Sequence, residues 1–136
     1  MSEIQNYRLL DSGSERKLEQ VGPYLIERQC PVAFWKAKLP PSAWSKAVAV
    51  HVRSEKGGGH WNFKAKNLPP FWWVLWGGLK LKVKLTSFGH LGFFAEQASQ
   101  WQWFQNKVVE LQKAGLERPK ILNLFAYTGG SSLSLA

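Results

Sequence analysis

The chain has 136 residues, of which 45% are hydrophobic and 14% aromatic, and its 18 Lys and Arg against 9 Asp and Glu give a formal net charge of +9. This composition excludes an intrinsically disordered chain, because such chains have too few apolar residues to offset the entropy lost on folding. It also excludes a disulfide scaffold, because Cys30 is the single cysteine.

Further features of the sequence predict a cytoplasmic protein with neither a membrane span nor a metal site. Met1–Gln5 lacks the basic and apolar character of a secretory leader, and a lone cysteine suits a reducing compartment. The most apolar stretch, 68–79, is far shorter than the ~20 residues of a transmembrane helix. Cys30, His51 and His60 lack the spacing of metal ligands.

Several short strands are predicted in the first two thirds of the chain. Turn residues such as Gly13 and the Gly22-Pro23 and Pro69-Pro70 breakers separate runs of apolar and β-branched residues. The predicted strands cover 7–14, 24–28, 47–52 and 61–63. Together they indicate a mainly antiparallel β region.

The clearest strand is 79–85, where leucines and a valine alternate with Lys80, Lys82 and Lys84. Strict alternation places the apolar side chains on one face and the three ammonium groups, roughly 6–7 Å apart, on the other. This row predicts either an ordinary solvated sheet face or a stripe that contacts phosphates.

The positive charge is concentrated around these strands. Residues 28–95 contain 11 basic residues against the single acid Glu55, together with six of the eight tryptophans. Interleaved cations and flat rings suit a nucleic acid, because cations meet phosphates and rings stack on bases. The nucleic-acid-binding candidates are Lys80, Lys82, Lys84, Trp61, Trp72 and Trp73. A basic surface over a Trp-rich core is the alternative for the same pattern.

The periodicity becomes helical after residue 95. Trp101, Phe104, Val108 and Leu111 follow one another at steps of three or four, which predicts a helix over about 96–114 ending at Gly115. The apolar run 121–125 has the length and composition of a buried parallel strand. A Gly-containing turn at 128–132 and the first turn of a helix at 133–136 follow it. The pattern is that of a βαβ unit without its second strand, so we expect a truncated chain.

The residues of this turn carry the chemistry. Asn123-Leu124-Phe125-Ala126-Tyr127-Thr128-Gly129-Gly130-Ser131-Ser132 resembles motif I of class I S-adenosylmethionine (SAM)-dependent methyltransferases. Within them it is most similar to the subgroup with a Phe-x-Tyr-Thr-Gly-Gly motif, which includes ribosomal RNA methyltransferases. The resemblance implies SAM as cofactor, bound by Tyr127, Thr128, Gly129, Gly130 and Ser131.

Two further stretches support the same resemblance. The segment 88–97 resembles the one that precedes the catalytic domain in this subgroup, which adds Phe88, Glu96 and Gln97 to the cofactor residues, with His90 and Phe93 beside them. Parts of residues 9–35 resemble the N-terminal region of bacterial, notably cyanobacterial, members. The acidic residue for the ribose and the Asp-Pro-Pro motif of the family are not found in the sequence, so we expect the chain alone to be inactive.

The fold class predicted is α+β, in three parts. These are a β-rich accessory region (1–92), a connecting helix and linker (93–118), and the first strand, turn and helix of a Rossmann-like SAM-binding domain (119–136). The expected function is methyl transfer to RNA, with ribosomal RNA as substrate. The alternative is a non-catalytic basic RNA-binding module.

Overall fold

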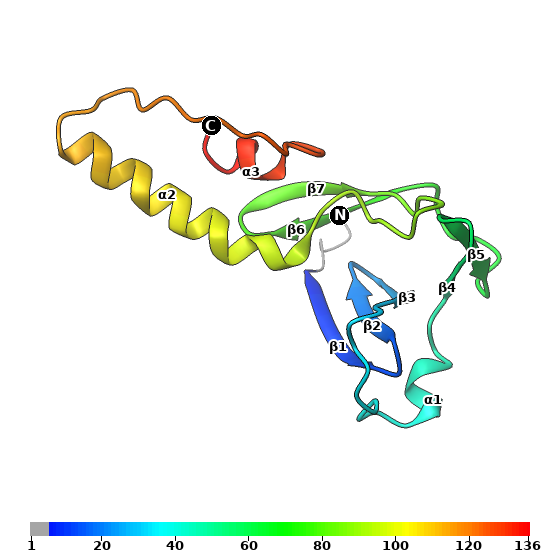
Figure 1. Ribbon diagram of the computed structural model, residues 1–136. Coiled ribbons are helices and arrows are strands. Elements are labelled where there is room, and N and C mark those ends of the chain that lie inside the picture. Colours follow the sequence, from blue (N-terminus) through cyan, green and yellow to red (C-terminus); the bar gives the residue numbers. More distant parts are fainter. Residues whose placement is uncertain (1–5) are drawn as a thin grey trace.

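The computed structural model describes residues 6–136 and contains two antiparallel-rich sheets and one long helix (Figure 1). Met1–Gln5, on which the expected absence of a leader rests, lies outside the described residues. The first sheet has five strands in the order β1-β2-β3-β4-β5, and the second is the hairpin β6-β7. The mixed α+β class predicted from the sequence is confirmed.

The first sheet is built from a three-stranded antiparallel meander and a hairpin, joined by one parallel pair. Strands β1, β2 and β3 form an antiparallel meander. Strand β3 then pairs in parallel with β4, which pairs antiparallel with β5. Their bounds are Tyr7–Gly13, Arg16–Val21, Tyr24–Gln29, Ala49–Arg53 and Gly59–Phe63. The crossover between β3 and β4 carries the short helix α1, Pro41–Trp44.

Strand β2 was not expected from the sequence. It contains Arg16, Lys17 and Glu19, and this density of charge hides the alternation that predicts a strand. Glu19 is completely buried, as are its apolar neighbours Leu18 and Val21. The tertiary structure therefore supplies the partners that make a charged strand stable.

The hairpin of β6 (Trp72–Trp76) and β7 (Leu79–Val83) closes the core against the first sheet. Leu81 and Val83 are buried while Lys80 and Lys82 are exposed, so the predicted alternation of this strand is confirmed. Strand β6 was missed because the run Phe71–Trp76 is apolar throughout, but Trp72 and Val74 are buried and Trp73 and Leu75 exposed.

The predicted connecting helix is present. A 3-10 turn at Ala95–Gln97 leads into α2, Ala98–Lys113, and Gly115 follows in the left-handed conformation. Trp101 is its one buried residue, and the helix extends away from the sheets (Figure 1). Within residues 6–136, no helix has the length and apolar character needed to cross a membrane.

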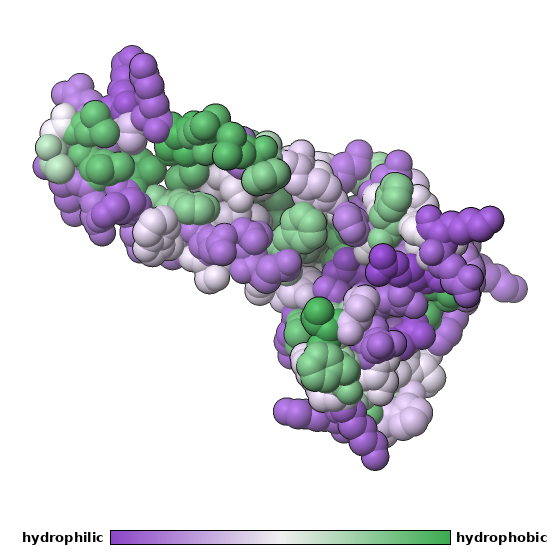
Figure 2. All heavy atoms as spheres, in the orientation of Figure 1, coloured by the Kyte–Doolittle hydropathy of each residue, from purple (hydrophilic) through white to green (hydrophobic). Residues whose placement is uncertain are grey.

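The predicted strand at 121–125 is wrong. The segment runs back along α2 without regular structure (Figure 1), because none of the described strands lies beside it to complete its backbone hydrogen bonds. The terminal helix, α3, is also displaced from the predicted 133–136 and occupies Gly130–Leu133. Figure 2 shows the resulting apolar surface over α2 and the returning segment.

Candidate functional site

The turn 127–131 has the backbone geometry of a specialised loop. Tyr127 adopts φ +51° and Gly129 adopts φ +89°, both in the left-handed region. Glycine tolerates this region without cost, whereas a tyrosine occupies it only where its surroundings hold it there. The Gly129 amide donates to the Ala126 carbonyl at 2.8 Å, and the Thr128 hydroxyl donates to the Gly92 carbonyl at 2.5 Å. The second bond ties the turn to the segment before α2.

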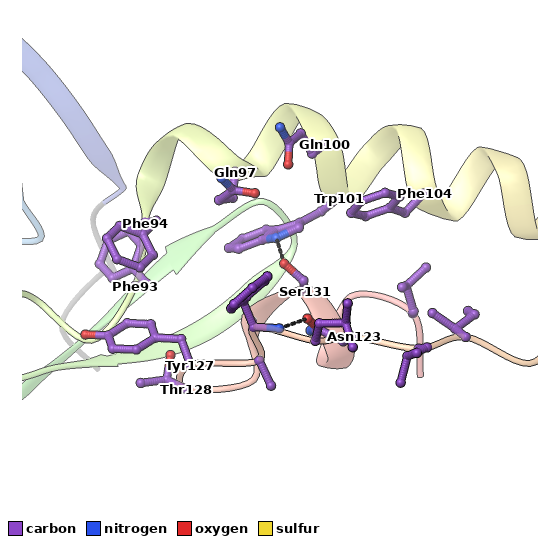
Figure 3. A pocket seen from close by; sticks show the side chains of 17 residues that line it. Phe93, Phe94, Gln97, Gln100, Trp101, Phe104, Asn123, Tyr127, Thr128 and Ser131 are labelled. Atoms are coloured by element: carbon purple, nitrogen blue, oxygen red, sulfur yellow. Dashed lines mark hydrogen bonds between the residues drawn. The ribbon is translucent and has the colours of Figure 1, made fainter.

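Trp101 of α2 attaches the turn to the body of the protein. Its indole N–H donates to the Ser131 hydroxyl at 3.0 Å (Figure 3). A Cβ on Gly130 would lie 3.0 Å from the indole ring, and a Cβ on Gly77, in the β6-β7 turn, would lie 2.6 Å from it. Glycine at both positions therefore allows the backbone to approach the two sides of one tryptophan.

The turn and α2 enclose a cavity of about 510 Å³, here named the first cavity (Figure 3). Four predicted cofactor residues of the turn line it, together with Gln97: these are Tyr127, Thr128, Gly130 and Ser131. Gly129 is absent from the lining and acts through the backbone conformation of the turn. The lining holds no charged side chain, and its side-chain polar groups are amides, hydroxyls and the indole N–H of Trp101.

The other two predicted cofactor residues, Phe88 and Glu96, line a second cavity of about 350 Å³. This cavity lies between the first sheet and the loop 86–94, and His90 also lines it. Phe93 and Phe94 line both cavities. The structure thus divides the predicted cofactor residues between two adjoining sites rather than placing all of them around one.

A buried ion pair holds the loop of the second cavity in place. Arg28 donates to both carboxylate oxygens of Glu19, at 2.6 and 2.7 Å, and its remaining Nη1 donates to the Gly89 carbonyl at 2.8 Å. The Tyr7 hydroxyl donates to Glu19 at 2.7 Å, and the Lys17 ammonium lies 3.3 Å from the same carboxylate.

These contacts decide the charge of the pair. Burial raises the pKa of Glu19, but the Arg28 guanidinium and Lys17 lower it more, so the net pKa lies below the ordinary value of 4.5. Burial and the adjacent carboxylate raise the pKa of Tyr7 far above its ordinary value. At neutral pH the network therefore holds an ionised Glu19 and a neutral, hydrogen-donating Tyr7.

The predicted nucleic-acid-binding residues divide into exposed and packed groups. Lys80 and Lys82 are exposed, with their ammonium groups 5.1 Å from the centre of the Trp73 ring and 3.9 Å from that of Phe71. Lys84 is exposed, and Trp73 keeps 42% of its surface exposed. These residues form one outward face of the β6-β7 hairpin and its continuation.

The remaining two tryptophans are engaged in packing. Trp72 is buried and its indole donates to the Val21 carbonyl at 2.9 Å. Trp61 is half-buried, packs edge-on against His51, and donates to the Thr86 carbonyl at 2.7 Å. Both tryptophans therefore fit the alternative prediction of a Trp-rich core, and neither is as exposed as Trp73.

Sequence reasoning missed the residues that shape the cavities. Trp101 was recognised only as part of a helical stripe, and its apolar character gave no indication of the bond to Ser131. Lys17 and Arg53 line the second cavity, but a charge on a strand carries no information about which cavity it faces. Residues 6–136 contain no group of three or more His, Cys, Asp and Glu able to hold a metal.

The solved structures similar to this chain include two proteins described as methyltransferases. A SAM-dependent methyltransferase from Agrobacterium tumefaciens is 36% identical, with a TM-score of 0.84, over 100% of this chain and 42% of its own length. A Streptococcus mutans protein to which SAM-dependent methyltransferase activity is attributed is 16% identical, with a TM-score of 0.62, over 98% of this chain and 36% of its own. The second likeness concerns the fold alone.

Neither a protein-family model nor a curated protein matches the chain. The chain spans less than half the length of both solved proteins. Both structural neighbours are SAM-dependent methyltransferases, and the matches cover 100% and 98% of this chain.

Proposed function

We propose that this chain is the N-terminal part of a SAM-dependent methyltransferase that acts on RNA, with ribosomal RNA as the substrate class. The observation that carries the proposal is the turn 127–131, which closes a cavity against α2 in a chain that matches the Agrobacterium tumefaciens methyltransferase along its whole length. The likeness to these enzymes gives no separate support to a non-catalytic RNA-binding module.

The residues of the first cavity fit one end of SAM. The ring centres of Phe94 and Tyr127 lie 5.0 Å apart, and 42% and 52% of these side chains are exposed. Aromatic faces attract cations such as a sulfonium, and the lining has no basic residue to repel one. Thr128, Gln97 and Gln100 offer hydrogen bonds to the polar groups of the cofactor.

In this proposal the chain binds and orients the cofactor. When bound, SAM supplies an electrophilic methyl group: the lone pair of the acceptor atom forms the new bond to carbon, and the sulfur–carbon electron pair returns to sulfur. Tyr127, Phe94 and Phe93 line the first cavity, and their rings would limit the access of water to the methyl group. RNA as the acceptor rests on the concentration of positive charge in residues 28–95.

The proposal is tested with a chimera in which residues 1–136 are followed by the part of the Agrobacterium protein beyond the matched region. Calorimetry should detect SAM binding to this chimera. In Gly129→Ala the turn would leave the left-handed conformation. Binding SAM would then have to restore that conformation at a free-energy cost of about 1–2 kcal/mol, so the affinity should fall about tenfold.

Gly115→Ala is the matched control. Gly115 has φ +95° and Gly129 φ +89°, and a Cβ at either position meets nothing within 4 Å. The control should leave SAM affinity unchanged. A folded chimera without SAM affinity, or equal losses in the two variants, would contradict the proposal.

A further inference from the structure

The second cavity is lined by Phe88 and Glu96, which the sequence assigned to the cofactor, but the predicted cofactor residues of the turn 127–131 and Gln97 do not line it. Its walls come from β2, β3 and β4 on one side and from the loop 86–94 on the other, and the Arg28 bond to the Gly89 carbonyl joins the two walls. It contains none of the three lysines of β7 and its continuation. The class of ligand that this cavity binds must therefore be inferred from its own lining residues.

The cations of the cavity favour an anionic ligand. Arg53 is exposed at the end of β4 and, among the described residues, forms no ion pair. Lys17 lies 3.3 Å from Glu19, but Arg28 already engages both oxygens of that carboxylate. Glu96 is the one acid in the lining. Arg53 and Lys17 are thus the groups available to a phosphate.

Aromatic side chains line the same cavity as these cations. Phe88 is 69% exposed and packs loosely, its ring centre 6.5 Å from that of His90. His90 in turn lies 5.9 Å from Phe94 and 6.2 Å from Tyr127. Flat rings in the same cavity as cations suit a nucleobase and its phosphate.

The position of the cavity relates this ligand to the methyl group. Phe93 and Phe94 line both cavities, and the ring centre of Tyr127 in the first lies 6.2 Å from that of His90 in the second. A base held on Phe88 and His90 would therefore lie at the boundary of the proposed cofactor cavity. The lysine row of β7 lines neither of these two cavities.

We propose that the second cavity is the acceptor site: it binds one nucleotide of single-stranded RNA, with the base on Phe88 and His90 and the phosphate on Arg53 and Lys17. The assignment rests on the proposed function for the identity of the ligand. A single strand is required because a base paired in a helix exposes only its edges and cannot stack on a protein ring.

Fluorescence anisotropy with a fluorescein-labelled single-stranded RNA of ten nucleotides tests this on the 136-residue chain. Arg53→Gln should raise the Kd and reduce the slope of log K against log salt by about 0.7, the value for one lost phosphate contact on a single strand. Phe88→Ala should raise the Kd about fivefold or more through lost stacking. Phe88→Leu, which keeps an apolar side chain, should show most of the same loss.

Two exposed residues that do not line the second cavity provide matched controls. Lys113→Gln removes one positive charge at the end of α2, and Phe34→Ala removes a phenyl ring that is 83% exposed. Both should leave the RNA affinity and its salt slope unchanged. Thermal unfolding of each variant confirms that it is folded.

The inference is overturned if the chain binds no RNA, or if Arg53→Gln and Phe88→Ala behave like their controls. Weakening caused only by Lys80→Gln and Lys82→Gln would move the RNA site to the outer face of β7. Failure of the proposed function is recognised separately, because the chimera would then bind no SAM whatever the RNA affinity. Retained SAM binding without any effect of Arg53 or Phe88 overturns the acceptor site alone.

Discussion

The two sheets and the C-terminal segment 115–136 contain the same apolar residue types and place them in opposite environments. In the sheets, Leu18, Val21, Ile26 and Val74 have at most 1% of their surface exposed. In 115–136, Leu122 is 81% exposed, Leu124 73% and Phe125 92%, and Ser134 is the single buried residue. Apolar character alone therefore does not bury a segment, because burial also requires a neighbouring element of matching shape.

The two regions also differ in how they bind their polar groups. The N-terminal sheet buries an ionised glutamate and surrounds it with Arg28, Lys17 and Tyr7. The C-terminal segment relies on isolated bonds, such as that of Trp101 to Ser131 and that of Gln105 to the Ser134 carbonyl. We expect the two regions to respond very differently to the same substitution.

The largest difference is expected for glutamate. Glu19→Gln leaves Arg28 buried with a neutral partner, and removing one member of a buried ion pair costs about 3–5 kcal/mol. Glu117→Gln, at an exposed position in the C-terminal region, should change the free energy of unfolding by less than about 0.5 kcal/mol. Urea unfolding followed by circular dichroism measures both, and similar values would remove the contrast between the regions.

The pH dependence of stability provides a second measurement on the same pair. The pKa of Glu19 is lower in the folded protein than its ordinary value of 4.5. The ionised Glu19 therefore contributes its full stabilisation of the fold above pH 4.5, and this contribution is lost as the pH falls through the folded pKa. The free energy of unfolding should therefore decrease in acid more steeply for the wild type than for Glu19→Gln. Parallel curves would show that Glu19 is not the titrating group.

Leucine truncation should give the next largest difference. Leu18→Ala removes a side chain with 1% exposure from the first sheet and should cost about 2–5 kcal/mol. Leu122→Ala removes the same atoms from a side chain that is 81% exposed and should cost less than about 0.5 kcal/mol. A large loss for Leu122→Ala would mean that residues 121–125 are buried in solution.

The smallest expected difference concerns the contact between the regions at Trp101. Gly77 and Gly78 both have left-handed backbones, but a Cβ on Gly77 would lie 2.6 Å from the Trp101 ring and one on Gly78 would meet nothing. Both alanine variants carry backbone strain, whereas overpacking adds about 1 kcal/mol or more to Gly77→Ala alone. Thermal unfolding distinguishes them, and equal losses would show that Trp101 is not held against the β6-β7 turn.

The sequence determined those features that depend on local periodicity. Alternation in 79–85 identified the exposed lysines of β7, steps of three and four identified α2, and Thr128-Gly129-Gly130 located the turn that lines the first cavity. The residues of one strand or helix fix such patterns among themselves, so no knowledge of distant segments is required.

Tertiary structure alone decided the features that depend on partners far along the chain. It made a strand of the charged segment Arg16–Val21 by pairing Glu19 with Arg28, and it left 121–125 without a strand because no strand of residues 6–136 lies beside it. It also divided the predicted cofactor residues between two cavities, both of which Phe93 and Phe94 line. Hydrogen-bond partners and cavity walls come from the packing of separate elements, which a linear pattern does not specify.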